Sequence, residues 1–185
     1  MKKTRKHFPV RGFVLFLPIV FTFGTSTSPA QEGPRAAQIA LTTRTDKDSV
    51  VLRWAPTKPG AWVVANRIGY IVERGKVEKN KKFNRNSFVR LTPAPLKPWT
   101  REEWLQRSPR DDNYAAIALQ AVHGKAFIAR PTQQGNVNAL RNAADELTNR
   151  YGFSLVAADN DAVAAEGLGL RLVDHDVKEG EEYIY

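Results

Sequence analysis

The chain has 185 residues, no Cys and a hydrophobic fraction of 42%, values typical of a globular protein rather than a disordered or collagen-like one. The absence of Cys excludes disulfides, thiolate zinc sites and a cysteine nucleophile. The net charge of +9 overstates the basicity of the folded part, because five of the 28 basic residues precede residue 31 in a stretch that contains no acid. The rest of the chain contains 23 basic and 19 acidic residues, and its net charge of +4 does not predict a nucleic-acid partner.

Residues 1–30 have the three parts of a secretory signal peptide. A basic segment is followed by an apolar run, Phe13 to Phe23, and then by small residues up to Ala30. As a helix the apolar run would reach about 16 Å, short of the roughly 30 Å hydrocarbon core, and Pro18 interrupts it. The sequence therefore predicts cleavage before Gln31 and no permanent membrane span, with an uncleaved anchor as the alternative. Export without disulfides favours secretion or display on the outer surface of a bacterium.

Four short β-strands are predicted before residue 98, in runs where apolar and polar side chains alternate: 39–44, 49–55, 67–74 and 87–91. A turn at 45–48 joins the first two as an antiparallel hairpin. Side chains two positions apart on a strand share a face. Leu52 and Trp54 are therefore expected in the core, together with Tyr70 and Val72 of the third strand.

These strands resemble strands B and C of a fibronectin type III domain. One pattern is Leu-x-Trp-x-x-Pro, with the proline shifted by one, and the other is Tyr-x-Val-x-Arg; the matching residues are Leu52, Trp54, Pro56, Tyr70, Val72 and Arg74. The C-terminal residues are similar to the E–F corner of that family. Leu168, Leu170 and Leu172 would form strand E, and Tyr183 would be the corner tyrosine whose hydroxyl bonds back to the chain a few residues upstream. The resemblance implies a mainly β fold, an immunoglobulin-like sandwich of two sheets.

Between residues 99 and 166 the pattern becomes helical. Thr100 and Glu103 form a capping box that opens the first of four predicted helices, Asp112 or Asn113 caps the second, and glycines end the later ones at Gly124, Gly152 and Gly167. Such a block resembles the helical insertion in the type III domains of large exported proteins from Bacteroidota-like bacteria. The expected organisation is a signal peptide, the first half of the sandwich, the insertion, and strand E with the start of strand F, at residues 1–30, 31–98, 99–166 and 167–185.

The expected sandwich is incomplete at its C-terminus. A type III domain has seven strands, whereas Tyr185 lies about three residues into strand F. Two explanations remain open: the chain is the N-terminal part of a longer protein, or another chain donates a strand.

No catalytic residue, cofactor or metal is predicted. The sequence lacks a Gly-x-Ser-x-Gly elbow, a phosphate-binding Gly-Lys-Ser/Thr loop and a dinucleotide-binding Gly-x-Gly-x-x-Gly turn. Asp174-His175-Asp176 is the one compact trio, but on a strand its carboxylates share a face and the His points away, so we assign it to a polar strand end. His123 is expected to stabilise the C-terminal end of a helix.

Exposed aromatic side chains bind sugars and proteins, which makes Trp62, Trp99 and Trp104 the candidate ligand contacts. The alternative that we favour is that they seal the sandwich against the helices. A basic loop holds Lys76, Lys79, Lys81, Lys82 and Arg85 around Phe83 and could attach to an anionic surface.

The sequence thus predicts a non-catalytic exported module with a structural or adhesive role. Its expected partners are a protein or glycan ligand at the cell surface and further domains of the same polypeptide, with no nucleic acid. The alternative is a carbohydrate- or protein-binding accessory module of a secreted enzyme, and a stand-alone hydrolase is a third, weaker candidate.

Overall fold

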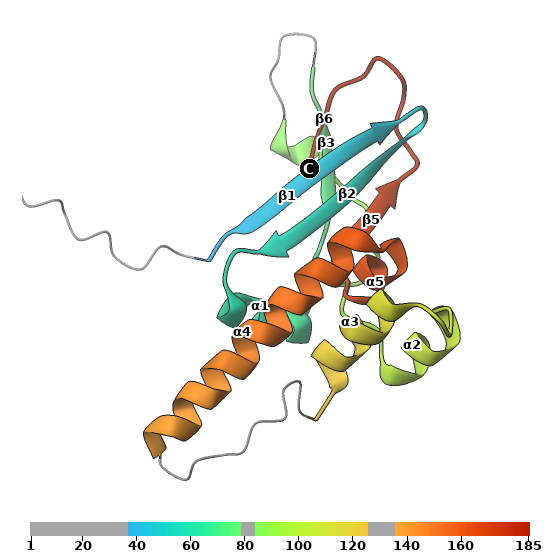
Figure 1. Cartoon of the computed structure of the whole chain (residues 1–185). Helices are drawn as coiled ribbons and strands as arrows, with labels where there is room; N and C mark the ends of the chain where they lie inside the picture. The colour runs from blue at the N-terminus through green and yellow to red at the C-terminus, as the bar shows by residue number, and fades with distance from the viewer. Residues whose placement is uncertain (1–36, 79–83, 126–135) are drawn as a thin grey trace, which may run out of the picture. The chain divides into compact units, whose positions relative to one another are not determined.

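The computed structural model describes residues 37–78, 84–125 and 136–185. The predicted signal peptide and the middle of the basic loop lie outside these ranges. The described residues form two small antiparallel sheets and five α-helices (Figure 1). The architecture is therefore mixed rather than mainly β, and the two sheets do not close.

The first sheet has the order β1-β2-β5 and is antiparallel throughout. Its strands are β1 (Ile39–Asp46), β2 (Ser49–Pro56) and β5 (Arg171–Asp174). The predicted hairpin is confirmed, since β1 and β2 pair along their whole length and Asp46 pairs with Ser49 across a two-residue turn. On β2 the buried residues alternate, with Val50, Leu52 and Trp54 on one face.

The second sheet has the order β4-β3-β6 and is also antiparallel. Its strands are short: β3 (Glu73–Lys76), β4 (Val89–Arg90) and β6 (Tyr183–Ile184). A short 3-10 helix, η1 (Arg85–Ser87), takes up the start of the run that predicted a fourth strand at 87–91.

The prediction of a third strand over 67–74 is wrong in its first half. Helix α1 (Pro59–Ile68) occupies the preceding residues, and a proline in its first turn fits a helix start, where the missing N–H is not needed. Gly69 then turns the chain with φ +86°, and a Cβ there would lie 2.7 Å from Pro95 Cβ. The next residue, Tyr70, forms an isolated antiparallel bridge with Leu96. The regular strand begins only at Glu73.

Helices α2 (Arg101–Arg107), α3 (Asn113–His123), α4 (Asn136–Asn160) and α5 (Ala162–Gly167) follow β4 and precede β5. The predicted capping box is confirmed: Thr100 Oγ1 accepts from Glu103 N, and the Glu103 carboxylate accepts from Thr100 N. Asp112 caps α3 by accepting from the N–H groups of Tyr114 and Ala115.

The prediction that a helix ends at Gly152 is wrong, because α4 continues to Asn160. A glycine inside a helix costs only about 1 kcal/mol relative to Ala. Contacts of the two preceding residues offset that cost: Arg150 donates to the carbonyls of Ala121 and Gly124, and Tyr151 Oη donates to Pro56 O at 2.6 Å. The helix ends one residue before Asp161, which caps α5.

Strand E was expected from Leu168, but regular pairing in β5 begins at Arg171. Gly169 has φ +67°, which departs from strand geometry, and Leu168 and Leu170 on either side of it are both fully buried. Leu170 O still accepts a hydrogen bond from Trp54 N at 3.1 Å, which extends the ladder between β2 and β5 by one bond.

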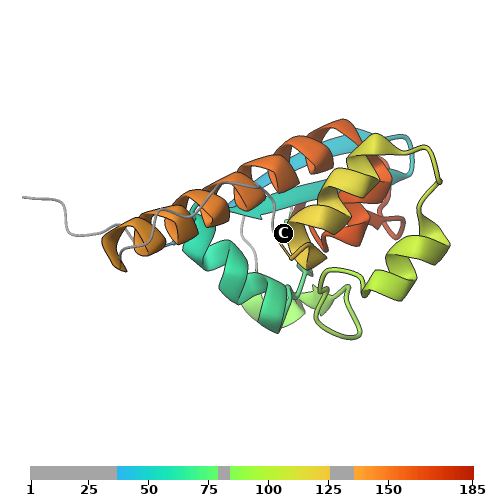
Figure 2. The ribbon, with the colours of Figure 1, turned by 60° about the horizontal axis from the view of Figure 1, so that its bottom comes forward.

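The helices and the first sheet share one hydrophobic core. A single cluster of buried residues contains Leu52 and Trp54 of β2, Trp104 of α2, and alanines of α3, α4 and α5. Alanine lets backbones approach closely, and α4 runs alongside the β1–β2 hairpin in both ribbon views (Figures 1 and 2). The helical block is therefore part of the core and not an appendage on its outside. None of the described helices is long and apolar enough to cross a membrane.

The close packing of α5 on α2 predicts that the stability of the fold depends strongly on a glycine at position 167. A Cβ built at this position would lie 2.3 Å from the buried ring of Trp104. We expect Gly167→Ala to lower the free energy of unfolding by about 1–3 kcal/mol through overpacking. Urea unfolding followed by circular dichroism measures this change.

Gly152→Ala is the matched control, because no atom lies within 4 Å of a Cβ at that helical position. We expect it to raise the free energy of unfolding by about 0.5–1 kcal/mol. Equal effects of the two substitutions would contradict the contact between Gly167 and Trp104.

Candidate functional site

A buried ion pair joins the two sheets. Arg74 of β3 is 9% exposed, and its Nη1 donates to both carboxylate oxygens of Asp174 of β5, at 2.9 and 3.0 Å. The carboxylate of Asp174 also accepts from Tyr185 Oη at 2.9 Å and from the backbone N–H of Asp176. Both oxygens of a carboxylate that is only 4% exposed are thus satisfied.

Arg74 has further partners in the segment that follows β5. Its Nη2 pairs with Asp176 at 2.8 Å, and its guanidinium lies 5.2 Å from the centre of the Tyr183 ring. We call Arg74, Asp174, Asp176, Tyr183 and Tyr185 the Arg74 network. It connects β3, β5 and β6, so that the C-terminal residues of the chain close around one guanidinium.

The titration behaviour of the Arg74 network follows from these contacts. The hydrogen bond and charge of Arg74 lower the pKa of Asp176. Burial alone would lower the pKa of Arg74, but its hydrogen bonds and charge interactions with the two aspartates raise it instead. Burial, with the hydrogen bond to Asp174, raises the pKa of Tyr185, which stays protonated and donates to the carboxylate.

The hydroxyl of Tyr183 joins β6 to the turn that precedes it. It accepts a hydrogen bond from the backbone N–H of Lys178, five residues upstream, at 3.1 Å, and donates to Glu181 at 2.7 Å. Glu181 also pairs with Lys76 of β3. The turn between β5 and β6 is thereby tied to both neighbouring strands of the second sheet.

The trio at 174–176 serves structure in this arrangement. Both of its carboxylates bind Arg74, and His175 is exposed. Among the described residues no group of three or more His, Cys, Asp or Glu side chains could hold a metal ion. His123 Nε2 lies 2.7 Å from the carbonyl oxygen of Trp99, which ties the end of α3 to the segment before α2.

Two of the three candidate aromatic contacts, Trp62 and Trp104, are buried, and Trp99 is half-buried. Trp62 lies on α1 and is 3% exposed, and its ring faces Tyr151. Trp104 is 1% exposed and packs edge-on against the half-buried Trp99, whose ring is covered by Arg107 at 5.1 Å. Their burial argues against a role as a sugar-binding platform. The other expected core residues are distributed similarly: Leu52, Trp54 and Tyr70 are buried, and Val72 is half-buried against the core.

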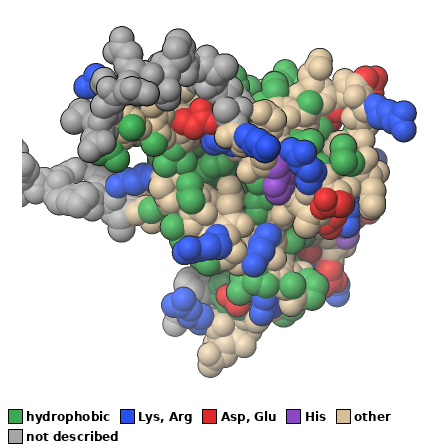
Figure 3. Space-filling view, turned by 90° about the horizontal axis from the view of Figure 1, so that it is seen from below, with side chains coloured by type: hydrophobic (Ala, Val, Ile, Leu, Met, Phe, Trp, Pro, Cys, Tyr) green, Lys and Arg blue, Asp and Glu red, His purple; other side chains and the backbone are tan. Residues whose placement is uncertain are grey.

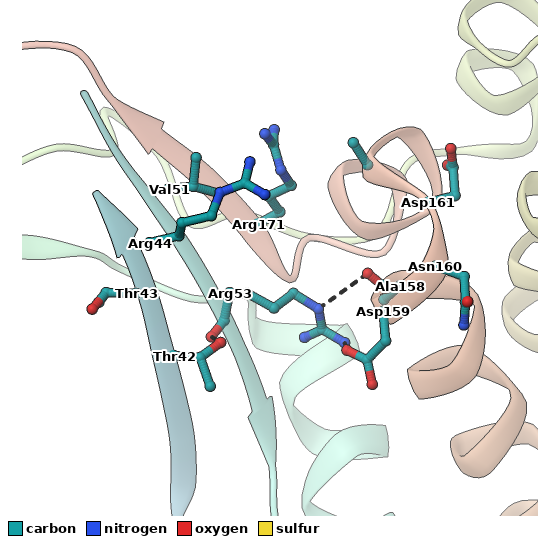
Figure 4. Close-up of a pocket in the computed structure, with 11 residues that line it drawn as sticks. Thr42, Thr43, Arg44, Val51, Arg53, Ala158, Asp159, Asn160, Asp161 and Arg171 are labelled. Atoms are coloured by element: carbon teal, nitrogen blue, oxygen red, sulfur yellow. Dashed lines mark hydrogen bonds and ion pairs between the residues drawn. The ribbon is translucent and has the colours of Figure 1, made fainter. Parts of the chain in front are cut away.

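The outer face of the first sheet carries a basic pocket of ≈ 480 Å³, where Arg44, Arg53 and Arg171 lie near the end of α4 (Figure 4). Arg53 and Arg171 are directly opposite each other on β2 and β5, an arrangement that like charges disfavour. Asp159 pairs with Arg53 at 3.1 Å, and Glu166 pairs with Arg171. Two of the three guanidinium groups are thus neutralised from the helices, and the pocket links the sheet to α4 and α5.

The basic loop is described only at its ends. Lys76 pairs with Glu181, and Arg85 is exposed at the start of η1, whereas Lys79, Lys81, Lys82 and Phe83 lie outside the described residues. On the face seen in Figure 3, Lys and Arg side chains lie among apolar and acidic ones. This distribution does not resemble a phosphate-binding stripe.

Sequence reasoning quoted Arg74 as part of a strand pattern but did not predict its partners. The signal was present, because Arg74 lies two residues after Val72, on the strand face expected in the core, where a charge needs a buried partner, and the Asp174–Asp176 segment held unassigned carboxylates. Comparison of the chain with protein-family models, with curated proteins and with solved structures gave no match.

Loss of Arg74 should destabilise the fold strongly. Arg74→Met leaves the carboxylate of Asp174 buried without a cation, so we expect the free energy of unfolding to fall by about 3–5 kcal/mol. The exposed Arg44, changed to Met, should cost less than about 0.5 kcal/mol. A double variant with Asp174→Asn should lose less than the sum of the single losses in urea unfolding, and additive losses would contradict the pair.

The Arg74 network should also make stability depend on acid pH. Because the pKa of Asp176 in the folded protein lies below its ordinary value, its charge stabilises the fold above that ordinary value. This stabilisation is lost as the pH falls through the folded pKa. We expect Asp176→Asn to flatten the decline in stability between about pH 5 and pH 2, measured by urea unfolding at stepped pH. The exposed Asp111→Asn variant is the control and should follow the wild-type curve.

Proposed function

We propose that the chain is an exported, non-catalytic module of the fibronectin type III kind, either secreted or displayed on a bacterial cell surface, with a structural or adhesive role. The observation that carries the proposal is the grouping of strands. In immunoglobulin-like sandwiches, strands A, B and E share one sheet, and strands C and F share the other. Here β1, β2 and β5 share one sheet, and β3 and β6 share the other.

Two contacts support the same assignment. Tyr183 bonds back to Lys178 N, as a tyrosine at the corner between strands E and F does. The ion pair of Arg74 and Asp174 joins the strands that would be C and E, one from each sheet. The helical block would then be an insertion between strands C′ and E that shares the core of the sandwich.

The chemistry of the described polar groups supports a non-catalytic role. The carboxylates and guanidinium groups with the lowest exposure bind one another across the sheets, and the tryptophans fill the interior. What remains at the surface is suited to contact with other macromolecules. With Trp62 and Trp104 buried, a protein ligand is favoured over a glycan. An accessory module of a secreted enzyme would use the same surfaces, and a catalytic domain encoded in the same reading frame would distinguish it.

Export is the testable part of this proposal. We expect a fusion of the full chain to bacterial alkaline phosphatase, which is active only outside the cytoplasm, to show activity in a bacterial host. N-terminal sequencing of the exported product should begin at Gln31. Phe16→Arg places a charge in the apolar run, and we expect it to reduce phosphatase activity at least tenfold.

Phe16→Leu keeps the run apolar and is the matched control, expected to leave activity unchanged. Retention of the wild-type fusion in the cytoplasm would overturn the proposed role at the cell surface. A protease added to intact cells then distinguishes surface display from release into the medium.

A further inference from the structure

An apolar groove opens beside β1. It has a volume of ≈ 320 Å³, and its lining includes Ile39 and Leu41 of β1, Leu52 and Trp54 of β2, Ile71, and Tyr185. Three of these apolar side chains are strongly exposed: Ile39 at 54%, Leu41 at 42% and Ile71 at 53%. The groove thus presents apolar surface from both sheets to solvent, with the core residues Leu52 and Trp54 at its floor.

Tyr185 also lines a second hollow, of ≈ 610 Å³, which lies along the later residues of the same strand. Here the β1 side chains are Thr43 and Thr45, which alternate with outward-facing residues as Ile39 and Leu41 do. We call the two hollows together the strand groove. Its lining changes from apolar at the start of β1 to polar at the end.

The far end of the strand groove is acidic. Its lining there contains four acidic side chains, Asp46, Glu179, Glu181 and Glu182, against two basic ones, Lys47 and Lys178. Glu181 is paired with Lys76, and Asp46 accepts from the N–H of Lys47. A ligand that reaches this end is therefore favoured if it carries positive charge.

Both strands that border the strand groove are edge strands. Among the described strands, β1 pairs only with β2, and β6 pairs only with β3. An edge strand presents unpaired backbone N–H and C=O groups that can take up another strand. All eight residues of β1 are exposed. At the usual rise of a strand, eight residues give a free edge about 27 Å long.

We propose that the strand groove binds an extended segment of a partner protein as an added β-strand. Apolar side chains at alternate positions of that segment would contact Ile39, Leu41 and Ile71, and basic side chains at one end would lie near Asp46. A strand satisfies the free backbone edge, which a helix or a glycan cannot do, and its two-residue period matches the alternation along β1. The inference rests on the groove itself and does not depend on export.

Synthetic peptides test this proposal. The probe is a blocked ten-residue peptide of alternating Val and Thr with two Lys residues at one end, made in both chain directions so that the basic end is either N- or C-terminal. We expect one direction to bind the purified full chain in fluorescence anisotropy, and binding to weaken at high salt. A peptide with Glu in place of Lys should bind at least tenfold more weakly.

Variants locate the binding. Leu41→Lys places a charge in the groove at an exposed position, and we expect it to weaken peptide binding at least tenfold while the unfolding curve stays near that of the wild type. Arg44→Ala lies on the opposite face of the same strand and should leave the affinity unchanged. Hydrogen exchange should show new protection of backbone amides in β1 or β6 when the peptide is bound.

Four results would overturn the proposal: no binding of either peptide, binding that Leu41→Lys does not change, protection confined to other elements, or protection of β1 and β6 before any peptide is added. In the last case sedimentation distinguishes two occupants. A dimer would mean that a second copy covers the groove, and a monomer would mean that a segment of the same chain does.

Discussion

The two sheets depend on the ion pair of Arg74 and Asp174 for their mutual position. Removing a guanidinium and a carboxylate from water is costly, and the cost is offset only if every remaining hydrogen-bonding position finds a partner. Here Tyr185, the N–H of Asp176 and the ring of Tyr183 provide those partners. A shift of one sheet against the other would break several of these contacts together, so the network fixes the arrangement more strictly than apolar packing would.

The helical block is held by a different principle. Its buried residues are mostly alanines, which contribute little area each but allow backbones to pack closely. At Gly167 even the methyl group of an alanine would not fit, because the Trp104 ring occupies the space that a side chain would need. Close approach makes this part of the core sensitive to added volume, whereas the network between the sheets is sensitive to lost charge.

Local signals in the sequence predicted local structure well. The hairpin of β1 and β2 followed from alternation around a turn, and the caps at Thr100 and Asp112 followed from side chains that bond within three residues. Helix α1 was not predicted, because proline and glycine, here Pro59 and Gly60, usually interrupt regular structure, although a proline is favoured at a helix start. Helix α4 continued past Gly152 because contacts with α3 and β2, distant in sequence, outweigh one glycine. The strand groove needs the two sheets side by side, which no single segment of sequence encodes.

The ion pair links residues 100 positions apart in the sequence. The paired strands β2 and β5 are separated by a comparable number of residues. Contacts of such long range form late and slowly, because the intervening chain must be ordered before they stabilise it. Neither sheet reaches its full set of strands until the C-terminal residues are available. The two sheets of the described residues can therefore be completed only after β5 and β6 have been synthesised.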